Sequence, residues 1–281
     1  MPFTYKTVLI VGATSGIGAA MAEKLVAEGS KVIACGRRQD RIDQFVGKHG
    51  ADKASGIRVD ITDHANLDAF VEKARHRVLS DYPSLDCVFL NSGVQSATRL
   101  SRPLEFDLAK FHQEVNVNFT SIVNLMIKFL PHLQSKPHPT GLIVTGTHLA
   151  LVPAATMAAY SASKAALTAF VDCCRAQNRQ KSTKIIEIYP PVVQTESWQN
   201  TTDPGDIAEL HDWMGVENGR ALGMPVEKFT EEAYSELLKG DEMVVVGSIA
   251  TEPREVYMDL VDRRRKIFDK LAGAMLSRFE L

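Results

Sequence analysis

The sequence predicts an α/β fold: a single Rossmann-type, doubly wound parallel sheet with helices on both faces, in one domain over residues 1–281. Three observations predict this fold. Short apolar runs alternate with segments of helical periodicity, which is typical of a parallel sheet with crossover helices. A glycine-rich turn joins the first apolar run to the first helical segment. No repeat, low-complexity segment or linker divides the chain.

The strands are expected where apolar runs are short and end at turn residues. They cover residues 7–11, 31–35, 56–59, 87–90, 142–145, 184–189 and 243–246. The helices are expected where apolar residues recur with helical spacing. They cover residues 15–28 (closed by Gly29), 62–80 (with Thr62-Asp63 as caps), 108–133 and 158–178.

Two segments depart from this alternation. Residues 194–225 are polar and turn-rich, as expected of a substrate-binding loop. Its large side chains either line a binding site or only pack the loop onto the core: Trp198, Trp213, Met214 and Met224.

The segment 253–281 reads as a C-terminal amphipathic helix. Its apolar residues near helical spacing are Val256, Leu260, Ile267, Leu271 and Met275. Three consecutive arginines, residues 263–265, favour a solvated face over an anion site.

Composition excludes several classes of protein. A net charge of −2 with mixed signs gives no indication of nucleic acid or an anionic membrane as a partner. No apolar run reaches the 18 residues of a membrane span, and no signal peptide is evident. Four cysteines without C-x-x-C or His/Cys spacing predict neither a disulfide framework nor a metal site. We therefore expect a cytoplasmic protein.

The turn Gly12-Ala13-Thr14-Ser15-Gly16-Ile17-Gly18 predicts a dinucleotide site. The first glycine allows a tight turn, and the later ones let main-chain N–H groups and the helix start approach a pyrophosphate. The strand before it and the helix after it are the context that this motif needs.

The end of the second strand indicates which dinucleotide binds. A carboxylate there would bind the ribose 2′-hydroxyl of NAD, but the chain has Arg37 and Arg38 after Gly36. Guanidinium groups pair well with a phosphate, so we predict NADP(H), with Arg37 the favoured contact. The alternative is that both arginines are ordinary surface charges.

Tyr160 and Lys164 provide candidate chemistry. Four residues apart at the start of a helix, they share one face. A nearby ammonium favours the phenolate and should lower the pKa of Tyr160 toward neutrality. Tyr160 is therefore a candidate proton donor to a carbonyl oxygen that receives a hydride.

An ordered set of motifs resembles the short-chain dehydrogenase/reductase family over roughly residues 5–195. The set is the turn at residues 12–18, Asp60, Asn91-Ser92-Gly93, Asn118, Thr147, Tyr160 and Lys164. The resemblance implies that Tyr160 is the general acid or base and that Lys164 also binds the nicotinamide ribose. Asn118 would be the active-site asparagine, with Asn116 a close rival.

The resemblance also implies the cofactor contacts. Asp60 would lie beside the adenine, and Asn91 and Gly93 would line the site. The other residues expected to contact the cofactor are Gly12, Thr14, Ser15, Gly16, Ile17, Gly18, Pro190, Val193 and Thr195.

The chain departs from the family pattern at three positions. Thr147 stands where the family has its catalytic serine; it keeps a hydroxyl, but its methyl restricts the rotamer. Pro191 replaces a glycine and removes an N–H near the nicotinamide, and Ser92 replaces an alanine. His148, beside Thr147, is either an added donor or a structural residue.

Two functions remain open. The first is an NADPH-dependent reductase of a ketone or aldehyde, or the reverse alcohol dehydrogenase, with an apolar carbonyl substrate near Thr147, Tyr160 and residues 194–225. The second is a catalytically weak or inactive NADP-binding sensor or scaffold of the same fold, a reading that Thr147 supports. The resemblance also implies a homodimer or homotetramer.

Overall fold

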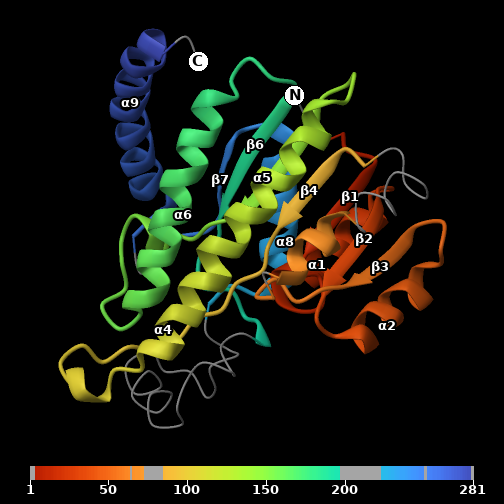
Figure 1. Ribbon diagram of the computed structural model, residues 1–281, viewed down its shortest axis with the longest axis horizontal. Coiled ribbons are helices and arrows are strands. Elements are labelled where there is room, and N and C mark those ends of the chain that lie inside the picture. The colour runs from red at the N-terminus through yellow and green to blue at the C-terminus, as the bar shows by residue number, and fades with distance from the viewer. Residues whose placement is uncertain (1–3, 64, 73–84, 197–222, 250–251, 280–281) are drawn as a thin grey trace.

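A computed structural model describes residues 4–63, 65–72, 85–196, 223–249 and 252–279. Its centre is a seven-stranded parallel sheet in the order β3-β2-β1-β4-β5-β6-β7 (Figure 1). The strands are β1 (Thr7–Val11), β2 (Lys31–Gly36), β3 (Ala54–Arg58), β4 (Cys87–Leu90), β5 (Thr140–Thr145), β6 (Thr183–Tyr189) and β7 (Met243–Val245). The Rossmann-type sheet predicted from the sequence is confirmed. The strand order reverses between β1 and β4, where such folds bind ligands at the carboxyl ends of the strands.

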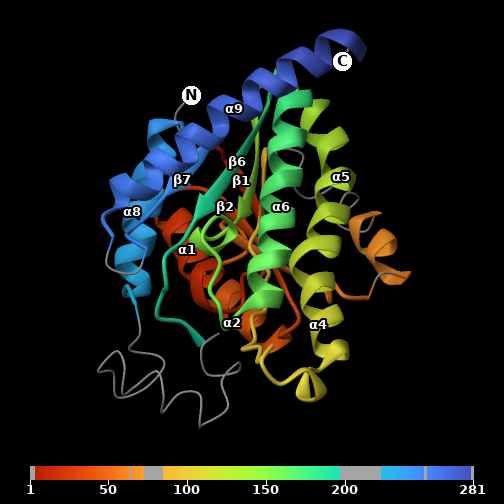
Figure 2. The same cartoon turned by 90° about the vertical axis from the view of Figure 1, so that its left-hand side faces the viewer.

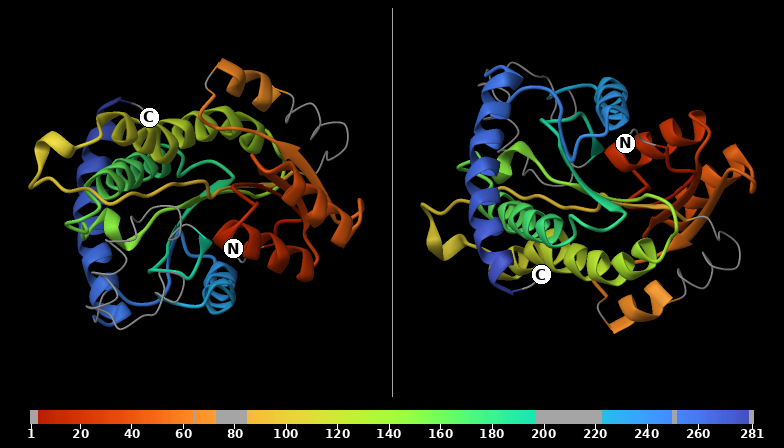
Figure 3. Two further views of the ribbon diagram at one scale, coloured as in Figure 1. Left: turned by 90° about the horizontal axis from the view of Figure 1, so that it is seen from below. Right: turned by 90° about the horizontal axis from the view of Figure 1, so that it is seen from above.

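Helices cover both faces of the sheet (Figures 2 and 3). One face packs against α1 (Gly16–Ala27), α2 (Gln39–His49) and α8 (Val226–Lys239). The other packs against α5 (Ser121–Gln134) and α6 (Ala158–Gln177), with α4 (Leu108–Val115) leading into α5. The apolar runs of β1 and β4 are buried completely because both faces are covered.

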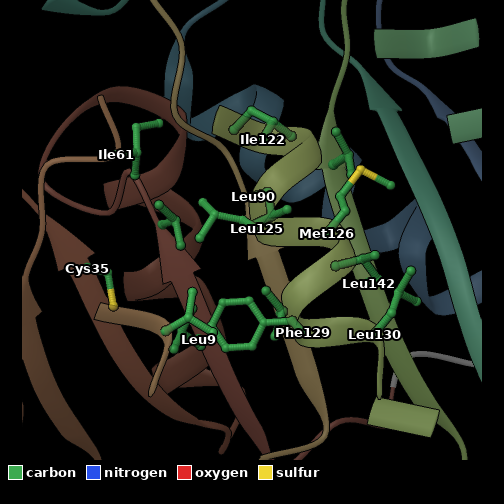
Figure 4. Packing of buried hydrophobic residues seen from close by; sticks show 14 of the residues in the cluster. Leu9, Cys35, Ile61, Leu90, Ile122, Leu125, Met126, Phe129, Leu130 and Leu142 are labelled. Atoms are coloured by element: carbon green, nitrogen blue, oxygen red, sulfur yellow. The ribbon is translucent and has the colours of Figure 1, made fainter. Parts of the chain in front are cut away.

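The core beneath α5 shows why the strands are so apolar. Leu125 and Phe129 of α5 lie over Leu9, Leu90 and Leu142 of three adjacent strands (Figure 4). All five side chains are fully buried. Burial of such a side chain contributes about 1.5–3 kcal/mol, so this layer fixes α5 against the sheet.

Among the described residues, two α-helices, α2 and α8, were not predicted from the sequence. In α2 only Ile42 and Phe45 are buried, so its apolar signal is weak. In α8 the buried residues Phe229, Ala233 and Leu237 follow helical spacing, a signal that sequence reasoning overlooked.

The helix predicted over residues 108–133 has an internal irregularity. A π-helical segment, η2 (Asn116–Thr120), separates α4 from α5. Single π turns of this kind are frequent at functional sites. Asn118 lies within it, fully buried.

The predicted C-terminal helix is α9 (Arg254–Phe279), which crosses α6 (Figure 2). Its predicted apolar residues lie on the outside, with exposed fractions of 42–71%. Tyr257, Val261 and Ala272 face the protein instead. The arginine run is not simply solvated: Arg264 pairs with Asp172 at 2.5 Å and Arg265 with Glu242 at 2.6 Å, which ties α9 to the domain.

Among the described helices, none has an apolar stretch sufficient for a membrane crossing. In the same residues no group of three or more His, Cys, Asp or Glu side chains is arranged to hold a metal ion. The predicted loop 194–225 falls mostly outside the described residues, and Trp198, Trp213 and Met214 with it.

Candidate active site

The glycine turn between β1 and α1 is tightly closed. Gly12 has φ +91°, and a Cβ there would meet the main-chain N of Ser92 at 2.8 Å. A Cβ on Gly18 would stand 2.1 Å from the Gly12 oxygen, so only glycine fits where α1 passes the turn. The N-cap residue Ser15 makes no side-chain capping bond, which leaves the first amides of α1 for a phosphate. The turn therefore fits a dinucleotide pyrophosphate.

Polar side chains gather at the end of β2. Arg38 donates to Thr14 Oγ1 from Nε and Nη2, both at 3.2 Å, and pairs with Glu196 at 3.1 Å. Arg37 is exposed and lies near Asp60. Partial burial raises the pKa of Asp60, but hydrogen bonds from Thr62 and the charge of Arg37 outweigh burial and leave this pKa lowered. Both arginines thus border the edge of the site predicted to take the ribose.

Asn91 connects three strand ends. Its Nδ2 donates to the Gly12 oxygen at 3.3 Å, and its Oδ1 accepts from Thr145 Oγ1 at 2.9 Å. Its main-chain N donates to the Val11 oxygen at 2.9 Å. Asn91 therefore holds the glycine turn in register with the end of β5.

Asn118 fixes the loop after β4. Its Oδ1 accepts from Val94 N and its Nδ2 donates to Val94 O, both at 2.8 Å. Nδ2 also lies 3.1 Å from Ser163 Oγ on α6. A Cβ on Gly93 would approach Asn118 Oδ1 at 3.4 Å and Lys164 Nζ at 3.6 Å. The structure therefore brings Asn118, Gly93 and Lys164 together, whereas Asn116, the rival candidate, is only partly buried at the start of η2.

Thr147 and Tyr160 meet between β5 and α6. Thr147 is buried at the N-cap of a short 3-10 helix, η3 (His148–Ala150), and its Oγ1 accepts from Leu149 N at 3.3 Å. The side chains of Thr147 and Tyr160 form a hydrogen bond. The threonine hydroxyl thus contacts the tyrosine from the position where the family pattern has a serine.

Lys164 lies one turn after Tyr160 on the same face of α6. Its Nζ donates to the Thr145 oxygen at 2.8 Å and lies 6.0 Å from the Tyr160 ring centroid. Burial lowers the pKa of Lys164 to about 8, and the charge of Glu187 opposes this shift.

The expectation that Lys164 lowers the pKa of Tyr160 toward neutrality is wrong in this structure. Burial raises the pKa of Tyr160 to about 12; the hydrogen bond with Thr147 lowers it, and Glu114 raises it further. Lys164 does not depress this pKa toward neutrality because its Nζ is directed to the Thr145 oxygen. Tyr160 is thus a neutral phenol at physiological pH.

The segment after β6 returns across the glycine turn. The Thr195 side chain lies 3.2 Å from the position of a Cβ on Gly16. Val193 forms a parallel bridge with Met224, and the Pro190 oxygen accepts from His148 N at 3.4 Å. Of these three predicted cofactor residues, Thr195 is therefore the one that lies against the glycine turn.

His148 has a structural environment. It is buried, its ring stacks on Tyr257 of α9 at 4.4 Å, and neither ring nitrogen has a hydrogen-bond partner within the described residues. Burial lowers the pKa of His148 to about 4, although backbone groups of Ser248 and Tyr189 raise it. His148 supports the Thr147 turn as a neutral side chain.

Two buried acids near the site were missed by sequence reasoning. Glu114, one turn before Asn118, accepts a short hydrogen bond from Ser96, and Oε1 has no partner within the described residues. Glu187 is fully buried in β6. The sequence held a signal for each: Glu114 shares a helix face with Asn118, and Glu187 interrupts an apolar strand.

Comparisons with known proteins agree with this geometry. The family model described as short chain dehydrogenase matches residues 6–205. The uncharacterized oxidoreductase DltE of Bacillus subtilis is 34% identical over 203 residues, 72% of this chain and 77% of that protein. A Saccharomyces cerevisiae protein named benzil reductase ((S)-benzoin forming) IRC24 is 29% identical over 68% of this chain and 73% of its own length.

Solved structures share the fold. A short-chain dehydrogenase from Sphingobium yanoikuyae, in complex with NADPH, has a TM-score of 0.74 at 19% identity, covering 92% of this chain and 93% of that one. A Burkholderia phymatum short-chain dehydrogenase/reductase, in complex with NAD, has a TM-score of 0.74 at 18% identity, with 87% and 90% covered. The matched family model, together with the sheet order, establishes that this chain belongs to the short-chain dehydrogenase/reductase family of oxidoreductases.

Proposed function

We propose that the chain is an NADP(H)-dependent oxidoreductase that reduces a ketone or aldehyde to an alcohol, or catalyses the reverse reaction. The observation that carries this proposal is the contact between Thr147 and Tyr160, one turn before Lys164. These groups lie at the carboxyl ends of the central strands, on the side of the sheet where the glycine turn opens.

Each side chain then has a role in reduction. Thr147 and Tyr160 hydrogen-bond the substrate carbonyl oxygen, and the neutral phenol of Tyr160 donates its proton to that oxygen. Lys164 places a positive charge near the phenolate that results. When bound, the nicotinamide supplies the hydride. Asn118 keeps the Gly93–Val94 loop in place beside the lysine.

We propose NADP(H) because the end of β2, Ala34-Cys35-Gly36-Arg37-Arg38, carries two arginines and no carboxylate. Relatives of this fold have been solved with either cofactor, so the arginines are the support for the preference. The KM values for NADPH and NADH test this point. A lower KM for NADH would contradict it.

The reaction is tested with Tyr160→Phe. General acid catalysis contributes about 10²–10⁴-fold, so turnover should fall by that factor while the Kd for NADPH stays unchanged. Benzil is a suitable first substrate because one relative is named as a benzil reductase. Turnover of the variant close to that of the natural chain would contradict the mechanism.

The inactive alternative predicts a different result. A sensor or scaffold would bind NADPH but oxidise it with no compound in a panel of ketones, aldehydes and quinones. All four cysteines are free, which fits the reducing cytoplasm that we propose as its location. A homodimer or homotetramer stays a prediction, to be tested by light scattering.

A further inference from the structure

Glu187 is a carboxylate in an unusual place. It is fully buried in β6, where its neighbours Ile186 and Ile188 belong to the apolar core. Burial of an ionisable group is costly unless its polar atoms are satisfied. A buried acid in such a strand therefore calls for a specific set of contacts.

Those contacts involve both carboxylate oxygens. Thr168 Oγ1 donates to Oε1 at 2.6 Å, and the Tyr189 hydroxyl donates to Oε2 at 2.7 Å. Oε1 also lies 2.5 Å from the position that a Cβ on Gly146 would take. The carboxylate thus rests directly on the main chain at Gly146, and only glycine leaves it room.

Both of these neighbours belong to the candidate active site. Gly146 lies between Thr145, whose oxygen accepts from Lys164 Nζ at 2.8 Å, and Thr147. Thr168 lies one turn after Lys164, on the same face of α6. Glu187 therefore touches the turn that holds the lysine and the helix that presents it.

Other charges around Glu187 are already paired with each other. Arg175 of α6 and Arg264 of α9 both bind Asp172, at 2.9 and 2.5 Å. Tyr257 of α9 packs against Tyr189 with tilted rings, at a centroid distance of 6.1 Å.

The electrostatic shifts agree with this arrangement. Burial lowers the pKa of Lys164, and Glu187 raises it. Burial in turn raises the pKa of Glu187, while the hydrogen bonds from Thr168 and Tyr189 and the charge of Arg175 oppose that shift.

We propose that Glu187 is a positioning residue of the active site: its buried carboxylate supplies the counter-charge of the Lys164 ammonium and holds the Gly146 turn that carries Thr147. Its effect on turnover rests on the proposed function. Its effect on Lys164 does not.

Titration of Lys164 tests the charge directly. The protein is labelled with ¹³C at the lysine Cε, and the Lys164 signal is assigned by its loss in Lys164→Arg. The midpoint should be about 8 in the natural chain. In Glu187→Gln the midpoint should fall by roughly one pH unit, because the substitution removes a negative charge close to the lysine. An unchanged midpoint would overturn the proposal.

Two further variants separate charge from packing. Asp172→Asn removes another buried negative charge from the same face of α6, and it should leave the Lys164 midpoint unchanged. Glu187→Asp keeps the charge but shortens the side chain, and it should keep the midpoint near that of the natural chain. The proposal is wrong if Glu187→Asp shifts the midpoint as far as Glu187→Gln. Thermal unfolding and NADPH binding confirm that each variant is folded.

The pH profile of turnover gives a second readout. A midpoint lowered by one unit leaves about a fivefold smaller protonated fraction at pH 8 and almost the same fraction at pH 6. Glu187→Gln should therefore lose about fivefold in kcat at pH 8 and little at pH 6. An equal loss of kcat at both pH values would show that Glu187 acts through packing alone, which would overturn the proposal. If the natural chain shows no turnover, the proposed function fails, while the lysine titration still decides the role of Glu187.

Discussion

Glu196 should compete with the 2′-phosphate of NADPH. Its carboxylate pairs with Arg38 at 3.1 Å and with Arg41 at 3.4 Å, beside the glycine turn. A 2′-phosphate bound by Arg38 would have to displace this carboxylate or tolerate its negative charge. Glu196→Gln removes the competing charge and keeps the shape of the side chain, so NADPH should bind more tightly.

The size of the effect follows from exposure. The three side chains are 38–45% exposed, and pairs of this kind contribute about 0.2–1 kcal/mol each because water screens them. Losing both pairs should therefore free about 1 kcal/mol for the phosphate, which is about a fivefold decrease in the Kd of NADPH. The gain should shrink as salt is added.

Fluorescence titration with NADPH and NADH measures both constants. Glu23→Gln is a matched control, since Glu23 is also 39% exposed and binds two side chains, Lys48 and His49, but on a different surface. NADH lacks the 2′-phosphate, so its Kd should stay the same in both variants. An equal gain for NADH, or no gain for NADPH beyond that of Glu23→Gln, would refute the reasoning.

Four other variants test the site and its support. Thr147→Ser should keep turnover, whereas Thr147→Val should lose about 10²-fold because Tyr160 loses its hydroxyl partner; steady-state kinetics compare them. Burial lowers the pKa of His148 to about 4. Below about pH 6.5 the unfolded chain therefore binds a proton that the folded chain does not, and the free energy of unfolding decreases as the pH is lowered. Urea unfolding should show a loss of about 2 kcal/mol between pH 7.5 and 5, absent in His148→Phe, which can still stack on Tyr257. Gly18→Ala should abolish NADPH binding in a titration, since its Cβ would overlap the turn at 2.1 Å.

The strands were predictable because their signal is local. A strand buried on both faces must be a short apolar run, and β1 and β4 each show one. The helix α2 escaped prediction because it lies at the edge of the sheet and buries only Ile42 and Phe45. With the partly buried Val46 these residues do follow helical spacing, but they are few among polar neighbours, so the pattern is easily overlooked.

The site shows the same limit. Tyr160 and Lys164 could be found because one helical turn separates them, and spacing alone puts them on one face. The pKa of Tyr160 could not be predicted from that spacing, since it depends on where the ammonium points and on how deeply the phenol is buried. Glu187 reaches the site only through the pairing of β5 with β6, which sets Glu187 opposite Val144, two residues before Gly146. A contact that depends on how two strands pair cannot be predicted from the residue pattern of either strand alone.

The two shifted groups together bear on the direction of the reaction. Below pH 8 the structure holds a charged Lys164 beside a neutral Tyr160, which is the state required to donate a proton to a carbonyl oxygen. Oxidation would need the phenolate, which forms only near pH 12 because burial raises the pKa of Tyr160. Because the lysine loses its charge well before the tyrosine does, raising the pH removes the supporting cation before it creates the base. This state suits the reduction that we propose, and the proposed role of Glu187 predicts that the state persists over a wider pH range, because Glu187 opposes the loss of the lysine proton.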